Sequence, residues 1–286
     1  MVATGIMFAA VTGVVRHIGS DMPAVEAAFL RYLFGLIMVL PMIMRNWTGV
    51  PNREAMNLYL VRGLVHGAGV NLWFYAMARI PIAEVTAIGY LAPIFVTIGA
   101  ALFLGEKFRI RRVVSIIVGF IGVLIILRPG FQEISAGQLA QLCAAPLFAI
   151  SFLITKKLTG KESSMMIVGM LSLLCTLVLL PGAIIYWQPP TLAEVLWLIL
   201  TAAFATAGHY TMTLAYQAAP ISILQPIGFL QLIWATLLGV TLFDEAMDPF
   251  VLVGGGIVVA AVSYISHREM VARREKPTPP DVAIKF

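Results

Sequence analysis

The sequence predicts an all-α membrane protein, with ten transmembrane helices arranged as two five-helix inverted repeats. Hydropathy is the first observation: of 286 residues, 60% are hydrophobic and 12% charged, whereas soluble domains carry about 25% charged residues. No Asp, Glu, Lys or Arg occurs from Val195 to Phe243, and about 20 apolar residues span a bilayer. Backbone groups in lipid must be paired within the segment, so these runs are expected to be helices.

The elements follow from the apolar runs taken in order. The longest run is divided at Pro220, because proline cannot continue the preceding helix. The first segment starts at Met1 without a basic leader, so we expect no signal peptide, and an incomplete start stays open. Cys143 and Cys175 lie inside segments and are expected to pack there without a disulfide. The predicted helices are 2–16, 23–44, 56–78, 81–104, 110–127, 137–157, 164–186, 192–217, 220–243 and 249–266.

An internal duplication is the second observation. Residues 76–106 and 215–245 align without a gap, 139 positions apart, with nine identities in 31 positions, such as Pro81 with Pro220 and Glu106 with Glu245. Chance would give roughly two or three in so apolar a chain, so we infer a repeat. Because each half has an odd number of helices, five, the second copy enters the membrane from the opposite side and is inverted relative to the first. The predicted units are a first repeat at 1–128, a second at 137–267, and a tail at 268–286 that we expect to be disordered.

The charge distribution is the third observation. With the N-terminus in the cytoplasm, inside segments hold fourteen Lys and Arg residues, and outside loops hold three, which are Arg16, Arg79 and Arg128. This bias predicts both termini in the cytoplasm of a multi-pass protein in a bacterial-type inner membrane. The net charge of +5 is therefore attributed to orientation in the lipid bilayer, and no nucleic-acid partner is expected.

Two copies of one half in a membrane chain are typical of a transporter with its binding site between them. In the fourth segment Thr86, Tyr90, Pro93 and Thr97 share one helical face. Their repeat mates include Gln225 and Phe229, and we expect both faces to line a central cavity. The alternative is that these side chains only pack helices together.

The eighth segment carries a polar stripe, from which His209, Tyr210 and Thr213 are candidate substrate-binding residues. Asn71 and Phe74, the repeat mates of Tyr210 and Thr213, are candidates on the third segment. His209 could contact a ligand or carry a proton, since its unperturbed pKa is near ~6.5. The alternative is a neutral imidazole that only joins helices.

Ionisable residues inside spans are costly and tend to be functional. Glu26, Arg31, Arg62 and Glu84 are therefore candidates for gating or coupling. The alternative is that they reach the interface or form permanent structural pairs. Glu106 and Glu245 lie at helix ends, where we expect structural pins.

Several short motifs resemble one known family. They are Glu26-Ala-Ala-Phe-Leu-Arg31, Ala92-Pro93, Leu104-Gly105-Glu106, Gly119-Phe-Ile-Gly122 before Arg128-Pro129, and Phe243-Asp244-Glu245 in the second half. With two five-helix halves, the chain is similar to the EamA family of the drug/metabolite transporter superfamily. The resemblance implies a secondary transporter of a small organic metabolite (an amino-acid derivative, S-adenosylmethionine or a vitamin-like compound) working by alternating access. It is not specific for substrate, direction or coupling ion.

Other classes fit the residues less well. An intramembrane enzyme needs a nucleophile with a base or a metal cluster, and the chain has no Gly-x-Ser-x-Gly or His-Glu-x-x-His motif. No enzymatic activity, cofactor or bound metal is therefore expected. A passive channel or a structural membrane protein is the remaining alternative. Gly63 and Gly67 have the spacing of close helix contacts, and a homodimer through such a face stays open.

Overall fold

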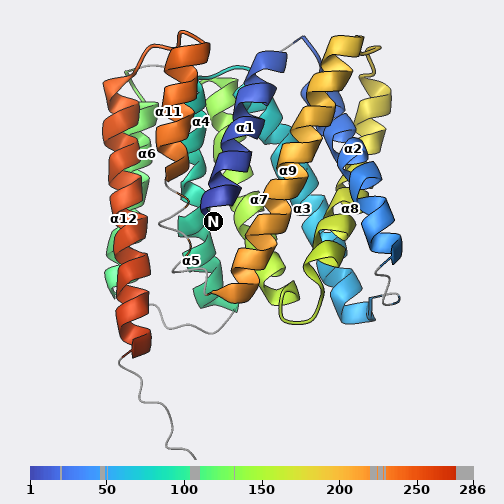
Figure 1. Ribbon diagram of the computed structural model, residues 1–286. Helices are drawn as coiled ribbons and strands as arrows, with labels where there is room; N and C mark the ends of the chain where they lie inside the picture. The colour runs from blue at the N-terminus through green and yellow to red at the C-terminus, as the bar shows by residue number, and fades with distance from the viewer. Residues whose placement is uncertain are drawn as a thin grey trace, which may run out of the picture.

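The computed structural model describes residues 1–19, 21–45, 49, 51–103, 110–131, 133–219, 224, 228 and 230–274. Within these ranges long helices run between the two ends of a bundle (Figure 1). The helices are α1 Val2–Ile18, α2 Ala24–Arg45, α3 Arg53–Met77, α4 Ile82–Gly89, α5 Leu91–Phe103, α6 Ile110–Leu127, α7 Ala136–Leu158, α8 Ser164–Ile185, α9 Leu192–Ala218, α11 Leu230–Leu242 and α12 Pro249–Arg274.

Most predicted segments coincide with these helices within a few residues. Among the described helices, α2, α7, α8 and α9 are each long and apolar enough to cross a membrane by length and composition. At its C-terminal end α12 continues to Arg274, so the first part of the expected tail is helical. The rest of that tail lies outside the described residues.

The predicted fourth helix is two helices, α4 and α5, which meet at Tyr90. Proline at position 93 has no N–H to donate to the carbonyl of Gly89, and its ring crowds that carbonyl. Tyr90 takes φ −69° and ψ −1°, which ends the regular helix for one residue. The sequence contained this signal, but a proline inside an apolar run is also compatible with a kinked continuous helix.

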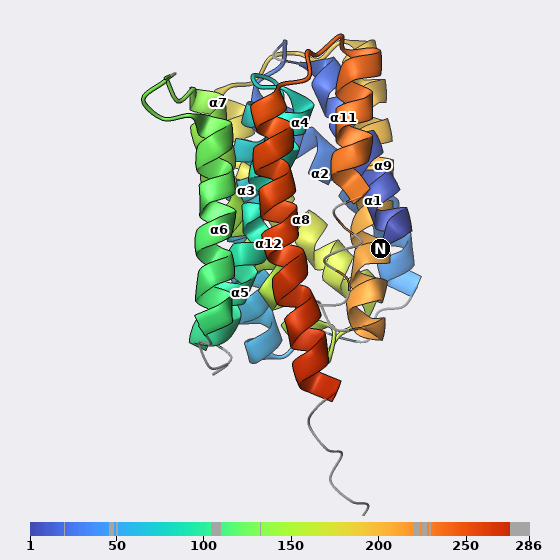
Figure 2. The ribbon, with the colours of Figure 1, turned by 90° about the vertical axis from the view of Figure 1, so that its left-hand side faces the viewer.

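The helix contacts show the two inverted repeats. If each helix is replaced by its repeat mate, the α3–α7 contact becomes the α9–α1 contact, and the α5–α7 contact becomes the α11–α1 contact. All four contacts occur in the structure. The α2–α8 and α6–α12 contacts each join a helix to its own repeat mate. Figures 1 and 2 show α6 and α12 side by side and running in opposite directions. The predicted fold class is thereby confirmed.

Two glycines allow α6 and α12 to approach closely. A Cβ added at Gly254 would lie 2.4 Å from the carbonyl oxygen of Gly122, and one added at Gly122 would lie 2.7 Å from the carbonyl oxygen of Gly254. Small residues at such crossings let membrane helices pack backbone to backbone. On the same helix, a Cβ added at Gly256 would meet nothing within 4 Å.

These two positions on α12 give a matched test of the α6–α12 contact. Gly254→Ala is expected to destabilise the protein by about 1–3 kcal/mol, because the added methyl group overlaps a backbone oxygen that cannot move independently. Gly256→Ala adds the same methyl group in open space and should be neutral or raise stability by up to about 1 kcal/mol through helix propensity. Thermal unfolding in detergent measures both, and equal melting temperatures would contradict the crossing described above.

Candidate functional site

A cavity of about 270 Å³ lies between the two halves. Side chains from α1, α2, α3, α4, α5, α7, α9 and α11 line it, so both repeats contribute. Its aromatic lining residues are Phe8, Tyr32, Trp73, Phe74, Tyr90, Phe148, Phe152 and Tyr216. Its polar lining residues are Thr4, Thr12, Arg31, His66, Thr86, Gln141, His209 and Gln231. A mainly apolar wall that is rich in aromatic side chains and also carries polar groups is typical of a site for a small organic molecule.

Two histidines meet in this cavity, one from each half. The rings of His66 on α3 and His209 on α9 lie edge to face, with centroids 5.2 Å apart. The Nδ1 of His66 lies 2.9 Å from the Ser151 hydroxyl oxygen. The Nδ1 of His209 is buried and has no hydrogen-bond partner in the described part of the protein. A ring nitrogen of His209 is therefore without a partner among the described residues, whereas one nitrogen of His66 is engaged by α7.

Arg31 brings a positive charge to the same cavity. Its side chain lines the cavity and the residue is only 3% exposed. The guanidinium carbon lies 3.8 Å from the centre of the Tyr32 ring, a cation–π contact. Within the described ranges Arg31 has no carboxylate partner that would neutralise its charge.

Several predicted site residues do line the cavity: Arg31, Phe74, Thr86, Tyr90 and His209. Thr86 also donates its hydroxyl hydrogen to the carbonyl oxygen of Ile82 at 2.8 Å, as the packing alternative anticipated. Gln225 and Phe229, the expected partners of Thr86 and Tyr90, lie outside the described residues, as does Glu106.

The structure places Asn71, Tyr210 and Thr213 outside the lining. Thr213 is fully buried and donates to the carbonyl oxygen of His209 at 2.8 Å. The part of α9 that faces the cavity carries Ala205, His209, Met212 and Tyr216. One residue along a helix rotates the side chain by about 100°, so Tyr210 points away from the cavity that His209 faces. The polar stripe covers more of the α9 surface than the part that lines the cavity. The sequence pattern alone did not show which edge of the stripe faces the cavity.

Three predicted gating residues have fixed partners away from the cavity. Glu26 accepts a hydrogen bond from the backbone N–H of Gln188 at 2.9 Å. Arg62 donates to the carbonyl oxygen of Ile167 at 2.9 Å, and Glu84 accepts from the Gln138 amide at 2.5 Å. Each contact joins the first half to the second. A gating role for these residues stays a prediction.

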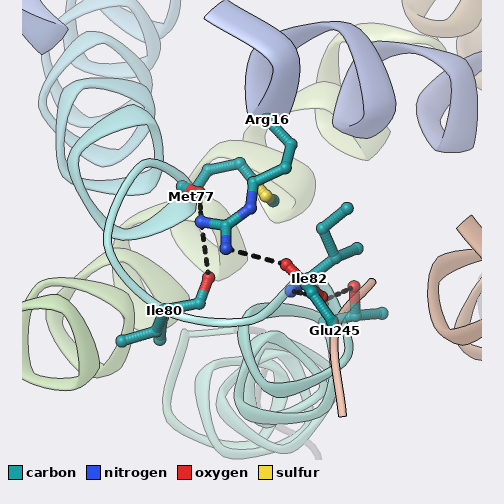
Figure 3. Close-up of polar contacts among 6 residues, drawn as sticks. Arg16, Met77, Ile80, Ile82 and Glu245 are labelled. Carbon is teal, nitrogen blue, oxygen red and sulfur yellow. Dashed lines mark hydrogen bonds and ion pairs between the residues drawn. The ribbon is translucent and has the colours of Figure 1, made fainter. Parts of the chain in front are cut away.

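An ion pair that the sequence did not single out joins the halves near one end of the bundle (Figure 3). Arg16 at the end of α1 donates to the carbonyl oxygens of Met77 at 2.9 Å and Ile80 at 3.3 Å. The other terminal nitrogen of Arg16 pairs with Glu245 at 2.9 Å. The second carboxylate oxygen of Glu245 accepts from the backbone N–H of Ile82 at 2.9 Å. We call this group the Arg16–Glu245 latch.

The latch satisfies backbone groups that helix ends leave without partners. The last carbonyls of α3 and the first N–H of α4 have no intrahelical partner, and Arg16 and Glu245 supply the charges that these ends favour. The chain reaches this position through Asp244 at φ 50°, a left-handed conformation that Asp tolerates better than most residues. Gly239 leaves room, because a Cβ there would lie 2.5 Å from a carboxylate oxygen of Glu245.

A related contact occurs at the other end of the bundle. Lys156 on α7 donates to the carbonyl oxygens of Tyr216 and, at 3.2 Å, Ala219. Tyr216 and Ala219 are the repeat mates of Met77 and Ile80, since the spacing is 139 in both cases. In each repeat, therefore, a cation from the first helix caps the end of the third helix of the same repeat, and the two caps lie at opposite ends of the molecule.

Two inverted five-helix halves around a shared cavity are typical of a membrane transporter. The comparison with known families agrees: residues 1–128 and 135–267 each match the EamA-like transporter family. The chain belongs to this family, and the two matched stretches correspond to the two repeats.

Named relatives cover nearly the whole chain. An S-adenosylmethionine uptake transporter of Rickettsia bellii is 27% identical over 91% of this chain and 90% of its own. A riboflavin transporter of Rhizobium johnstonii is 31% identical over 96% and 92%. The pseudopaline exporter CntI of Pseudomonas aeruginosa is 26% identical over 93% and 94%. The protein is thus a multi-pass membrane transporter of small metabolites, and not an enzyme.

A solved crystal structure shares the fold. It aligns with a TM-score of 0.64 at 16% identity and covers 96% of this chain and 99% of its own. At this identity the likeness concerns the arrangement of helices alone.

Proposed function

We propose that the protein carries a small organic metabolite with a planar aromatic or heterocyclic part, by alternating access of one central cavity. The observation that carries the proposal is the aromatic lining of a cavity between two inverted halves. Aromatic faces hold a planar ring without a fixed hydrogen-bond pattern, and a few polar groups orient it. The relatives named for S-adenosylmethionine, riboflavin and pseudopaline support this class. They include uptake and export, so direction is left open.

The two histidines and Arg31 are the polar contacts of this proposed site. The unpartnered Nδ1 of His209 either donates to the metabolite or accepts from it, according to the tautomer. His66 is held in orientation by Ser151, so the second imidazole is positioned before the substrate arrives. Prepositioned groups reduce the ordering cost of binding.

In this proposal the Arg16–Glu245 latch holds one end of the cavity closed. The latch links α1 and the α3–α4 turn of one half to the chain after α11 of the other half. Its two charged side chains are 21% and 9% exposed, so separating them requires hydration of both charges. Rocking of the halves would break this contact and open that end.

The proposed orientation places the latch on the outer side of a bacterial-type inner membrane and both termini in the cytoplasm. The basis is the excess of Lys and Arg on the opposite end, which the positive-inside rule assigns to the cytoplasm.

The transport test is flux into proteoliposomes with a panel of aromatic and heterocyclic metabolites, with and without proton and sodium gradients. His209→Ala is expected to lower flux of the transported solute roughly ten-fold, the equivalent of one lost hydrogen bond. Leu214→Ala on the same helix removes an exposed side chain and serves as the control. Chemical conversion of the solute without movement, or full flux in folded His209→Ala, would contradict the proposed site.

The latch test measures access to the cavity. Thr12→Cys, in a background with Cys143 and Cys175 replaced, places one thiol in the cavity lining. An impermeant thiol reagent is added from the side of the α1–α2 loop. Glu245→Gln should make the thiol at position 12 react about ten-fold faster, which corresponds to a shift of about 1.4 kcal/mol toward the open state.

Glu54→Gln is the control for this test. It removes an ion pair with Lys161 at the opposite end, where both side chains are about half exposed and water weakens the pair. The labelling rate should then stay near that of the parent. An unchanged rate in Glu245→Gln would refute closure by the latch.

Orientation is tested by labelling intact cells. Asp21→Cys lies between α1 and α2, and Gly160→Cys lies between α7 and α8, both at exposed positions. An impermeant maleimide is expected to label the first and not the second, because the two turns lie at opposite ends of the bundle (Figure 1). Labelling of both from outside would contradict the fold, and the reverse pattern would invert the proposed topology.

A further inference from the structure

Arg31 is a buried cation in the cavity wall with no carboxylate partner among the described residues. The residue is 3% exposed and lines the cavity. An isolated buried charge costs several kcal/mol, and the Tyr32 ring beneath the guanidinium offsets only part of that cost. The cavity wall therefore carries a positive charge that no described carboxylate balances.

The carboxylates that could neutralise Arg31 are committed elsewhere. Glu26 is on the same helix, but five residues apart places the two side chains on different faces, and Glu26 accepts from Gln188. Glu84 accepts from Gln138, and Glu245 pairs with Arg16. None of these three carboxylates lines the cavity.

A second unsatisfied group lies in the same cavity. His209 is 7% exposed, and its Nδ1 has no hydrogen-bond partner among the residues described. A chain of ring contacts joins the two groups: Arg31 stacks on Tyr32, the Tyr32 and His66 rings are 6.2 Å apart, and the His66 and His209 rings are 5.2 Å apart. Cation and imidazole therefore share one continuous wall.

We propose that this wall is a carboxylate site, so that the transported metabolite is an organic carboxylate, zwitterions included, attached to a planar ring. This inference rests on the proposed function and specifies its substrate class. One unpaired guanidinium balances one negative charge and can hold both carboxylate oxygens through a pair of parallel N–H donors. The aromatic residues around it receive the ring. A solute without an anion would leave the Arg31 charge uncompensated.

The test compares ligands that differ only in the carboxylate. S-adenosylmethionine is paired with its decarboxylated form, and tryptophan with tryptamine, and affinity for the detergent-purified full chain is measured by calorimetry. In at least one pair the carboxylate member should bind at least about ten-fold tighter to the wild-type protein, as charge-assisted hydrogen bonds require. Arg31→Gln should bring that ratio to about one.

Arg79→Gln is the matched control. Arg79 also stacks on a neighbouring tyrosine, with its guanidinium carbon 3.7 Å from the Tyr75 ring centre, but it lies outside the cavity lining. This variant should keep the ratio of the wild-type protein. If Arg31→Gln does not yield folded protein, Arg31→Lys is used, which keeps the charge and loses the paired donors. A ratio lowered by about three-fold or more supports the site, and an unchanged ratio overturns it.

Equal affinity within both pairs, binding of no member, or a preference that survives in folded Arg31→Gln would each overturn the carboxylate site. Flux of a solute that lacks a carboxylate, without discrimination, would refute this inference and leave the transporter proposal standing. Carboxylate-dependent binding without flux would support the carboxylate site and refute the transporter proposal.

Discussion

The need to partner every polar group at membrane depth is the constraint on which this structure depends. Helix ends expose carbonyl and N–H groups that lipid cannot solvate, and the bundle places several such ends next to its central cavity. Arg16 and Glu245 answer this need for the α3–α4 turn with two charges that neutralise each other. Because Glu245 comes from the second half, the same contact that completes the backbone also joins the repeats. A structural requirement thereby creates a contact that motion of the halves must break.

Buried polar groups without hydrogen-bond partners occur both in the cavity wall and away from it. Glu26, Arg62 and Glu84 each have a partner in the other half and lie away from the cavity, but Glu26 Oε1 and Arg62 Nε and Nη2 have no hydrogen-bond partner among the described residues. Arg31 and His209 line the cavity: Arg31 has no carboxylate partner among the described residues, and the Nδ1 of His209 has no hydrogen-bond partner there. Buried groups without partners are costly, and Arg31 and His209 are placed where a bound ligand could contact them. A ligand that supplies the missing contacts gains free energy that a fully satisfied pocket does not offer.

The sequence predicted most of the helices, the inverted repeat and five of the residues that line the cavity. Span positions follow from composition, which lipid constrains strongly, and the repeat follows from identities at fixed spacing. On α9 the sequence predicted His209, which lines the cavity, but also Tyr210 and Thr213, which do not, because the polar stripe does not show which edge faces inward. Arg16 was assigned to an outside loop, since its role depends on carbonyls far along the chain. One signal was available: Lys156 lies 140 positions after Arg16, close to the repeat spacing, and caps the equivalent helix.

The repeats keep their symmetry in the scaffold and lose it in the cavity. Arg16 and Lys156 cap equivalent helix ends, yet the two histidines are not repeat mates: the mate of His66 is Ala205, and the mate of His209 is Val70. Each half thus contributes one imidazole at a different depth along equivalent helices. A symmetric frame lets two end states have similar energy, as alternating access requires. An asymmetric wall lets a ligand with distinct ends bind in one orientation, with its polar end toward Arg31 and its ring among the aromatic side chains.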